Sequence, residues 1–502
     1  GRRGARRRRA RNRRRPGVEC GRAACETIRQ IIGACMNANL YALLASRFPA
    51  DRSAPCLLLP DAGVISYGEL ESGVGRLAAL LKAKGVAPGD RVAVQAPKTP
   101  ESLMLYLATL QAGGVFLPLN TAYTPAEVRY FLDDAEPKLF VTDAVPLARE
   151  AAALEPLADI HQAAAGDLAA IIYTSGTTGR SKGAMLSHGN LAANALALHT
   201  AWGFQPGDVL LHALPIFHVH GLFIALHCTL LNASPIIWLA RFDDTEVLSL
   251  LPRATVLMGV PTFYTRLLAN PGFTRAAAAH MRLFVCGSAP LLESTFEEFE
   301  ARIGVRILER YGMSEAAVIT TNPLSGERIA GSVGYPLPGV ELRIGGGEET
   351  GVIEIKGPSV FAGYWRMPEK TAEDFTADGF FITGDVGRRD PDGRVWISGR
   401  AKDLIITGGY NVYPKEIELI LDELPGVGES AVIGCPHPDF GEAVVAVIAG
   451  AGDEADIIAA ARETLAAYKA PKKVFFVEDL PRNAMGKVQK TLLRERFKGA
   501  FG

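Results

Sequence analysis

Apolar residues follow two alternating patterns along the first part of the chain. Short continuous apolar runs over 91–95, 115–119, 138–142 and 168–173 are typical of buried strands. Between two of these runs, residues 100–112 carry leucines at helical spacing and stop at two glycines, which predicts a helix. Strands that alternate with helices favour a parallel sheet, because parallel strands need crossover connections.

Local signals mark where some of these elements begin. Thr124, Pro125 and Glu127 have the spacing of a helix start, with Thr124 as the capping residue and proline in the first turn. The strand–helix alternation continues to about residue 340. From there, residues 341–397 contain short strand-like runs and turns, and the glycines of 345–351 indicate a hairpin turn.

These patterns predict an α/β fold of two unequal parts. The larger N-terminal domain has parallel sheets covered by helices and a β-rich subdomain. A short polar link, 399–403, leads to about one hundred residues with a compact α+β pattern, which we predict to be a small C-terminal domain. With 48% hydrophobic residues in 502, the chain has ample material for both cores.

Charge is distributed unevenly. Residues 1–35 hold 12 of the 53 basic residues and two of the 54 acidic ones, which leaves 41 basic against 52 acidic residues in the remainder. Such a cationic block cannot bury itself and is expected to be disordered. Since Met36 resembles a natural start, we expect residues 1–35 to be an upstream or vector-derived extension, with an organellar transit peptide as the alternative.

Two further features bear on the compartment. No apolar run approaches the roughly 20 residues that a membrane span needs, so none is expected. The seven cysteines show no metal-type pairing, which favours a reducing compartment. We therefore predict a cytoplasmic protein, or a mitochondrial one if residues 1–35 are a transit peptide.

The segment Tyr173–Gly183 has a composition suited to phosphate. Three glycines let its backbone N–H groups approach an anion, while hydroxyls and Lys182 supply further donors and positive charge. It follows a strand-like run, and α/β sheets bind ligands at such strand ends. The spacing differs from that of the P-loop, because Lys182 precedes glycine instead of a hydroxyl residue.

At this segment the chain resembles the adenylate-forming superfamily, which contains acyl-CoA synthetases, luciferases and the adenylation domains of peptide synthetases. The pattern Y-T-S-G-T-T-G-x-x-K-G resembles the phosphate loop of that superfamily. Five further motifs of the superfamily occur in its order: Phe217–Gly221, Tyr311–Glu315, Thr383–Asp385, Gly399–Asp403 and Pro481–Lys487.

The resemblance implies a two-step reaction. A carboxylate attacks the α-phosphate of ATP and expels pyrophosphate; the CoA thiol then attacks the acyl-adenylate and expels AMP. The implied division is an adenylation domain over 36–399, a hinge over 400–403 that pivots at Lys402, and a mobile domain over 404–502. Because both steps build negative charge, positioned cations and donors are expected to dominate catalysis.

Residue roles are carried over on the matching motifs only. Implied catalytic residues are Thr174, His218, Glu315 and Lys487. Implied ATP and AMP contacts are Thr174, Ser175, Gly176, Thr177, Thr178, Gly179, Lys182, Gly287, Ser288, Tyr311, Gly312, Ser314, Asp385 and Arg400. Glu315 and Thr177 would hold Mg²⁺, and Gly408 and Gly409 would line the CoA channel.

The acid itself is indicated by two arginines. Arg266 and Arg310 stand close to the expected acyl site, and arginine pairs bidentately with carboxylate. V-P-T-F-Y-x-R, F-H-x-H-G and E-R-Y-G-M together resemble the malonyl-CoA synthetase branch, with His218 and Met313 also beside the acid. The prediction is a malonate–CoA ligase using ATP, CoA and Mg²⁺.

Two alternatives stay open. One is a ligase for methylmalonate or for another short-chain or aryl carboxylic acid, since pocket depth cannot be read from sequence. The other is a protein of a different class, in which the arginine-rich residues 1–35 bind nucleic acid.

Overall fold

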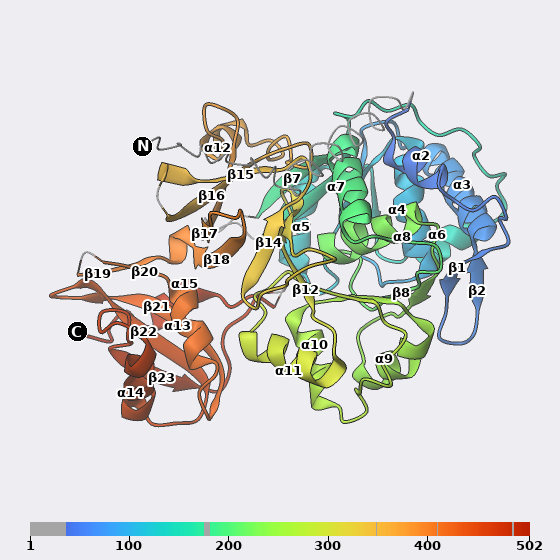
Figure 1. The fold of residues 1–502 in the computed structure, drawn as a ribbon. Coiled ribbons are helices and arrows are strands. Elements are labelled where there is room, and N and C mark those ends of the chain that lie inside the picture. The colour runs from blue at the N-terminus through green and yellow to red at the C-terminus, as the bar shows by residue number, and fades with distance from the viewer. Residues whose placement is uncertain (1–36, 175–180, 348, 409, 484–485, 502) are drawn as a thin grey trace, which may run out of the picture.

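The computed structural model describes residues 37–174, 181–347, 349–408, 410–483 and 486–501. It has a large N-terminal domain and a smaller C-terminal domain, which occupies the lower left of Figure 1. This confirms the predicted α/β fold class.

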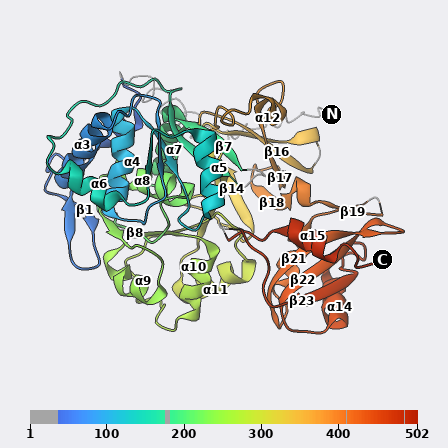
Figure 2. The same cartoon turned by 180° about the vertical axis from the view of Figure 1, so that it is seen from behind.

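A five-stranded sheet contains the strands that the apolar runs predict. Its order is β5-β3-β4-β6-β7, parallel from β5 to β6 and antiparallel between β6 and β7. The strands are β3 (Arg91–Val94), β4 (Val115–Pro118), β5 (Leu139–Val141), β6 (Leu168–Thr174) and β7 (Lys182–Ser187). Helices α4 (Pro100–Ala112) and α5 (Pro125–Ala135) lie in front of this region when the molecule is seen from behind (Figure 2).

The ends of these two helices follow the local signals. Thr99 caps α4, which ends at Gly113 in the left-handed conformation, with φ of 86°. Thr124 and Glu127 form the reciprocal hydrogen bonds of a capping box at the start of α5. The predicted bounds of the first helix and the predicted cap of the second are confirmed.

A second sheet of 13 strands runs through most of the N-terminal domain. Its order is β15-β16-β17-β18-β14-β13-β12-β11-β10-β8-β9-β1-β2. The strands are β1 (Pro55–Leu58), β2 (Val64–Ser66), β8 (Leu210–His212), β9 (Ile236–Trp238), β10 (Val256–Gly259), β11 (Leu283–Cys286), β12 (Leu308–Met313), β13 (Ala317–Thr321), β14 (Ser332–Pro336), β15 (Glu341–Ile344), β16 (Thr350–Lys356), β17 (Phe381–Arg389) and β18 (Val395–Arg400). The predicted β-rich segment therefore extends the parallel sheet instead of forming a sheet of its own.

The change from parallel to antiparallel pairing comes earlier than the sequence predicts. Strands β11 and β12 pair parallel, whereas β12 and β13 pair antiparallel, some 25 residues before the expected change near residue 340. The reversal brings two backbones together, since a Cβ on Gly312 would stand 1.8 Å from the carbonyl oxygen of Ala317. The residues between β12 and β13 are too few to show whether a helix connects the two strands, so the sequence pattern did not reveal the change to antiparallel pairing.

The C-terminal domain has its own sheet of five strands. Its order is β20-β19-β22-β21, and β23 pairs in parallel with β22. The elements are β19 (Ile405–Thr407), β20 (Tyr410–Val412), β21 (Val427–His437), β22 (Gly441–Gly450), β23 (Lys473–Val477), α13 (Pro414–Leu421), α14 (Glu454–Thr464) and α15 (Lys490–Phe497). This is the predicted α+β pattern.

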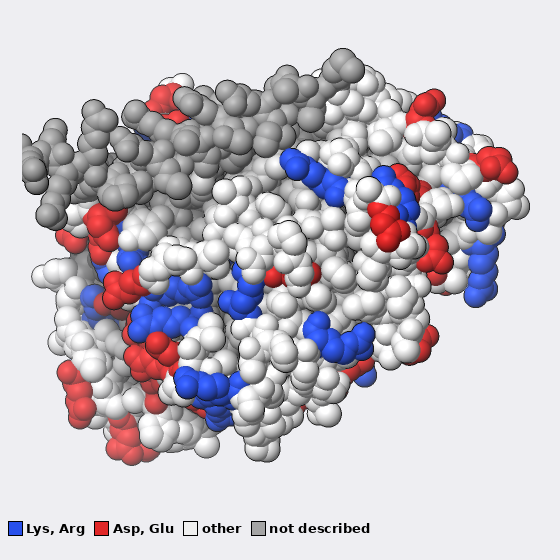
Figure 3. Space-filling model, turned by 45° about the vertical axis from the view of Figure 1, so that its right-hand side comes forward, with Lys and Arg blue, Asp and Glu red and all other residues white. Residues whose placement is uncertain are grey.

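Charged side chains on the surface are of mixed sign. On the face in Figure 3, lysine and arginine side chains stand near aspartate and glutamate side chains over much of the described surface. Within the described ranges, no helix is both long and apolar enough to cross a membrane.

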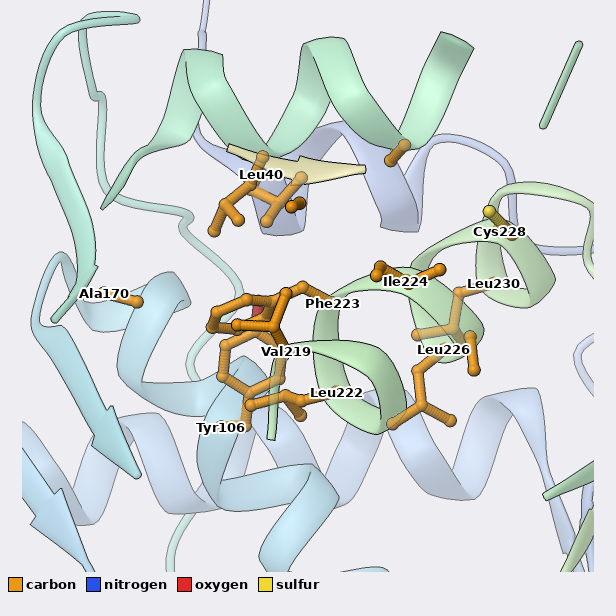
Figure 4. Close-up of a cluster of buried hydrophobic side chains, with 14 of the residues drawn as sticks. Leu40, Tyr106, Ala170, Val219, Leu222, Phe223, Ile224, Leu226, Cys228 and Leu230 are labelled. Atoms are coloured by element: carbon orange, nitrogen blue, oxygen red, sulfur yellow. The ribbon is translucent and has the colours of Figure 1, made fainter. Parts of the chain in front are cut away.

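The core of the large domain is closed by helices. Those not yet given are α2 (Leu40–Ala45), α3 (Tyr67–Ala83), α6 (Ala144–Ala151), α7 (His188–Ala201), the π-helix η1 (His220–Ala225), α8 (Leu226–Leu231), α9 (Asp244–Leu250), α10 (Pro261–Ala269), α11 (Glu293–Ile303) and α12 (Pro368–Glu373). Figure 4 shows Tyr106 of α4 beside Phe223 of η1, and their ring centroids are 5.8 Å apart. The π-helix, a rare element often found at functional sites, begins at His220.

Candidate active site

The segment predicted to bind phosphate joins two paired strands. Thr174 ends β6 and Lys182 begins β7, and the two residues face each other across the pair. The hydroxyl of Thr174 donates to the carbonyl oxygen of Lys182 at 3.4 Å. The remaining predicted phosphate and metal contacts of this segment lie outside the described residues: Ser175, Gly176, Thr177, Thr178 and Gly179.

Helix α5 holds both ends of this segment. The Tyr130 hydroxyl donates to the carbonyl oxygen of Ser181 at 2.8 Å, and the Tyr173 hydroxyl donates to the Asp134 carboxylate. The indole N–H of Trp365 donates to the Asp134 carbonyl oxygen at 3.1 Å. These hydrogen bonds therefore hold in place the residues at the start and at the end of the phosphate segment.

Lys182 and Glu315 are joined through Tyr364. Lys182 Nζ lies 3.3 Å from Asp374 Oδ2 and 4.1 Å from the centroid of the Tyr364 ring. The Tyr364 hydroxyl donates to Glu315 Oε1 at 3.2 Å. Burial raises the pKa of Glu315, while its backbone hydrogen bond and then the cations of Arg400 and Lys182 oppose that rise.

These surroundings suit a magnesium ion that is held mainly by phosphate. Among the described residues, no group of three or more His, Cys, Asp or Glu side chains is arranged so that it could hold a metal ion by itself. Glu315 is a single buried carboxylate near Lys182, and Mg²⁺ commonly binds through one or two carboxylates plus substrate phosphate oxygens. The residues present therefore fit the magnesium ion that the resemblance implies.

Asp385 is fixed on both of its oxygens. Gly384, with φ of 71°, lets β17 turn at this point, and Asp385 pairs with Arg400 across β17 and β18. The Tyr311 hydroxyl donates to Oδ2 at 2.5 Å, and Arg400 Nε lies 2.6 Å from Oδ1. Burial raises the pKa of Asp385, and Arg400 and Tyr311 oppose that rise. Tyr311, Asp385 and Arg400, which are all predicted ATP and AMP contacts, are thus brought together.

Lys487 approaches this group from the C-terminal domain. Burial lowers its pKa and nearby Arg400 adds to the effect, whereas Asp385 and Glu315 oppose it. The residue is nevertheless exposed to solvent. The structure therefore brings Lys487 to the predicted nucleotide residues of the other domain.

A second group of polar side chains is buried beside β12. Arg310 Nη2 donates to Ser288 Oγ at 3.4 Å, and Ser288 Oγ lies 3.3 Å from His220 Nδ1. Within the described part of the chain, neither Arg310 Nε nor His220 Nε2 has a hydrogen-bond partner. Burial lowers the pKa of Arg310 to about 10. A buried cation and two unused nitrogens suit an anionic ligand.

His218 adds a neutral ring to this group. Burial, and then the charges of Lys487 and Arg310, lower its pKa to about 4. The backbone N–H of His220 donates to His218 Nδ1 at 3.2 Å, so the neutral ring carries its proton on Nε2.

The Arg310 side chain lies directly on the backbone of Gly287. Gly287 follows β11, and a Cβ there would stand 2.5 Å from Arg310 Nε. Ser288 adopts φ of 73°, an uncommon conformation for a residue other than glycine. The turn of Gly287 and Ser288, which is predicted to contact ATP and AMP, therefore also touches Arg310.

Other predicted residues have different surroundings. Arg266, in the last turn of α10, is exposed, whereas Arg310 is buried, and no interaction described here joins the two side chains. Met313 ends β12 and, like Ser314, is half-buried. The joint role of the arginines stays a prediction.

The hinge and CoA-channel residues lie at the start of the C-terminal domain. Lys402 lies in the short 3₁₀-helix η4 (Ala401–Asp403), and burial lowers its pKa. Gly408 follows β19 with φ of 56°, and Gly409 lies outside the described residues. Their pivoting and channel roles stay predictions.

Several residues of the site were not singled out from sequence. Tyr364, Asp374 and His220 gain their place through contacts between distant segments. His220 alone had a local signal, because it falls within the motif that contains His218. Tyr364 and Asp374 had none.

Comparison with known proteins identifies the family. Residues 44–365 match the AMP-binding enzyme family, and residues 416–487 match the AMP-binding enzyme C-terminal domain. The chain is 34% identical over 516 residues to a malonate–CoA ligase of Arabidopsis thaliana, covering 87% of this chain and 85% of that protein. It is 37% identical over 468 residues to a feruloyl-CoA synthase of Amycolatopsis sp, covering 86% of this chain and 94% of that protein.

A solved structure agrees with these relatives. ATP-bound MatB from Rhodopseudomonas palustris matches with a TM-score of 0.89 and 51% identity, over 93% of this chain and all of that one. The resemblance to the adenylate-forming superfamily and its malonyl-CoA synthetase branch is confirmed as a relationship. The chain belongs to the AMP-binding enzyme family and is an AMP-forming acyl-CoA synthetase.

Proposed function

We propose that this synthetase is an ATP-dependent malonate–CoA ligase that forms a malonyl-adenylate and releases AMP and pyrophosphate. The observation that carries the proposal is the buried Arg310, whose Nε has no partner among the described residues. An arginine fork pairs well with a carboxylate, and a buried cation requires an anion nearby. The relationship to a malonate–CoA ligase supports the same acid.

Malonate has two carboxylates with different tasks. The distal one would pair with Arg310 and with the unpartnered His220 Nε2, while His218 presents a neutral ring to the rest of the acid. The reacting carboxylate would then point towards Lys487 and the nucleotide. The sequence prediction places Arg266 beside the same carboxylate; because Arg266 is exposed, we assign it to the rim of this pocket instead, together with the half-buried Met313.

In the first half-reaction one carboxylate oxygen attacks the α-phosphorus of ATP, and the bond to the leaving pyrophosphate breaks. Lys487 would balance the charge that builds on the α-phosphate and carboxylate, because its ammonium lies near Asp385 and Glu315. Asp385 would accept from the ribose hydroxyls, with Arg400 holding its orientation. Thr174 and Lys182 would contact the phosphates.

Magnesium would supply positive charge between the phosphate oxygens. Within this chain, Glu315 is the described residue that would hold the ion, and Tyr364 orients its carboxylate. Thr177 is the second proposed ligand.

In the second half-reaction the CoA thiol attacks the acyl carbon, and AMP leaves. We propose that the C-terminal domain pivots at Lys402 for this step, which withdraws Lys487 and brings Gly408 and Gly409 beside the thiol. Gly408 already adopts a conformation that favours glycine, so a side chain would be strained there as well as obstructive.

A panel of carboxylic acids tests the assignment. AMP release is measured with ATP, Mg²⁺ and CoA for malonate, methylmalonate, acetate, propionate, succinate and ferulate. We expect the highest kcat/KM for malonate, with methylmalonate second. If a monocarboxylate is preferred, the dicarboxylate assignment is wrong, and the feruloyl-CoA synthase relationship makes ferulate the sharpest competitor.

The same assay addresses residues 1–35. A chain beginning at Met36 should retain full ligase activity; if it loses nucleic-acid affinity at the same time, the arginine-rich segment is an appendage with that separate property. We propose a cytoplasmic location, and a mitochondrial one if this segment directs import.

A further inference from the structure

Lys98 is an enclosed lysine that no step of the proposed reaction uses. It lies after β3, and its Nζ is 2.6 Å from His212 Nδ1 and 2.9 Å from the His212 carbonyl oxygen. The Trp238 ring centroid lies 4.6 Å from the same nitrogen. Burial lowers the pKa of Lys98. Among the described residues no carboxylate forms an ion pair with it, so its polar contacts converge on His212.

These contacts define the protonation of His212. Its Nε2 lies 2.9 Å from the carbonyl oxygen of Gly221, and a carbonyl can only accept, so Nε2 carries the proton. In the neutral ring Nδ1 is then the acceptor, and the Lys98 ammonium donates to it. The ring also stacks on Trp238, with centroids 5.4 Å apart and planes 11° apart. Lys98 thereby selects one tautomer and one orientation.

His212 in turn closes a loop. Residues 212–221, named here the histidine loop, leave β8 and return so that the Gly221 carbonyl accepts from the His212 ring. Gly221, the last residue of the loop, packs directly against Pro215 in its middle, since a Cβ on Gly221 would stand 2.1 Å from the Pro215 carbonyl oxygen. Both ends of the histidine loop are therefore fixed by one ring, and Lys98 fixes that ring.

The histidine loop carries the groups that face the proposed acid. His218 and His220 project from it, and His220 Nδ1 lies 3.3 Å from Ser288 Oγ, which also accepts from Arg310. Misplacement of a group at the active site by about 1 Å can cost about 10²-fold in rate. A displacement of the loop at His212 would thus also displace His218 and His220 beside the proposed acid.

We propose that Lys98 is a positioning residue that, through His212, holds the histidine loop in the geometry that binds the carboxylic acid substrate. The proposal rests on the proposed function in placing the acid beside His218 and Arg310. It assigns Lys98 no contact with ATP, because its contacts lead to His212 and Trp238 and not to Lys182, Asp385 or Glu315.

The first test compares Lys98→Met with Lys84→Met. Lys84 is a matched control, since its Nζ pairs with the exposed Glu150 at 2.8 Å on the surface. Initial rates of AMP release are fitted separately for the acid and for ATP. We expect K98M to lower kcat/KM for the acid by at least tenfold with the KM for ATP within twofold of wild type, and K84M to change neither.

The second test asks whether the effect passes through His212. In a double-mutant cycle with K98M and His212→Gln, the double variant should lose little more than the larger single variant, because both break one chain of contacts. Nitrogen-15 spectra of histidine-labelled protein should also include the signal of a ring fixed in the Nε2–H tautomer that is absent in H212Q and changed in K98M.

The outcomes are separable from those of the acid panel. Both tests are run with whichever acid the wild-type protein prefers, so a preference for another acid overturns the malonate assignment and leaves the Lys98 proposal under test. Wild-type kinetics in K98M would overturn the positioning role. Equal losses for acid and ATP, or losses in K98M and H212Q that simply multiply, would show that Lys98 acts on general packing instead.

Discussion

Replacing Arg310 with methionine should separate stability from acid use. The guanidinium is buried, and its pKa falls to about 10 from an ordinary 12.5. At about 1.4 kcal/mol per pKa unit, the charge costs the folded protein about 3 kcal/mol. At pH 7 the group is charged in both the folded and the unfolded chain, so this cost is present in full. Methionine removes it and fills a similar length.

Only a modest interaction opposes that gain. The hydrogen bond to Ser288 is long, at 3.4 Å, and is worth about 1 kcal/mol. The R310M variant should therefore be as stable as wild type or up to about 2 kcal/mol more stable. Urea unfolding without substrates measures this free energy.

In contrast to stability, kcat/KM for malonate should fall in R310M. Truncating one partner of a buried charge pair costs about 2–5 kcal/mol, which corresponds to a fall in kcat/KM for malonate of roughly 30-fold or more. The KM for ATP should stay within twofold, and the ratio of acetate to malonate activity should rise. Wild-type malonate kinetics in R310M, or a loss of several kcal/mol in stability, would refute this reasoning.

Arg266→Met gives the matched comparison. Because Arg266 is exposed, its loss should cost no more than about 1 kcal/mol if it acts from the rim. A fall as large as that of R310M would instead show that both arginines hold the distal carboxylate.

Four further predictions follow from the site and the chain. Lys487→Ala should lower adenylation by about 10²–10³-fold and spare thioester formation from supplied malonyl-adenylate, because one positioned donor serves only the first half-reaction; assays of the separate half-reactions decide, and equal losses would contradict it. Tyr130→Phe should raise the KM for ATP severalfold and leave that for malonate unchanged, since the hydroxyl holds Ser181 at the end of the phosphate segment; an unchanged KM for ATP would count against that frame. His218, with its pKa lowered to about 4, is uncharged above about pH 5, so malonate kcat/KM should show no step from this histidine between pH 6 and 8; a step in that range that disappears in His218→Gln would be inconsistent with a neutral ring. Removing residues 1–35 should leave turnover unchanged, and a large loss of activity would make that segment part of the enzyme.

Local structure was the part most readily predicted from sequence. The helix Pro100–Ala112 has its stop signal in Gly113, and Thr124 and Glu127 cap the next helix over three residues. Such features depend on hydrogen bonds between near neighbours, so a short stretch of sequence contains both partners.

Contacts between distant segments could not be predicted in this way. Lys182 meets Asp374 across 192 residues, and Lys98 meets His212 across 114. Neither pairing changes the periodicity around its members, and a lone lysine is usually solvated. The early turn to antiparallel pairing at Gly312 was missed for a related reason, since strand direction is decided by the partner strand and not by the run itself.

The closeness of Gly287 to Arg310 makes the two positions interdependent. With arginine at 310, a methyl group at 287 would stand 2.5 Å from its Nε, so alanine at 287 would force the guanidinium to move. Once a shorter residue replaces the arginine, that space opens, and alanine or serine at 287 could fill it. A change at 287 that follows the loss of arginine at 310 would therefore occupy the space of the guanidinium and hinder a return to arginine.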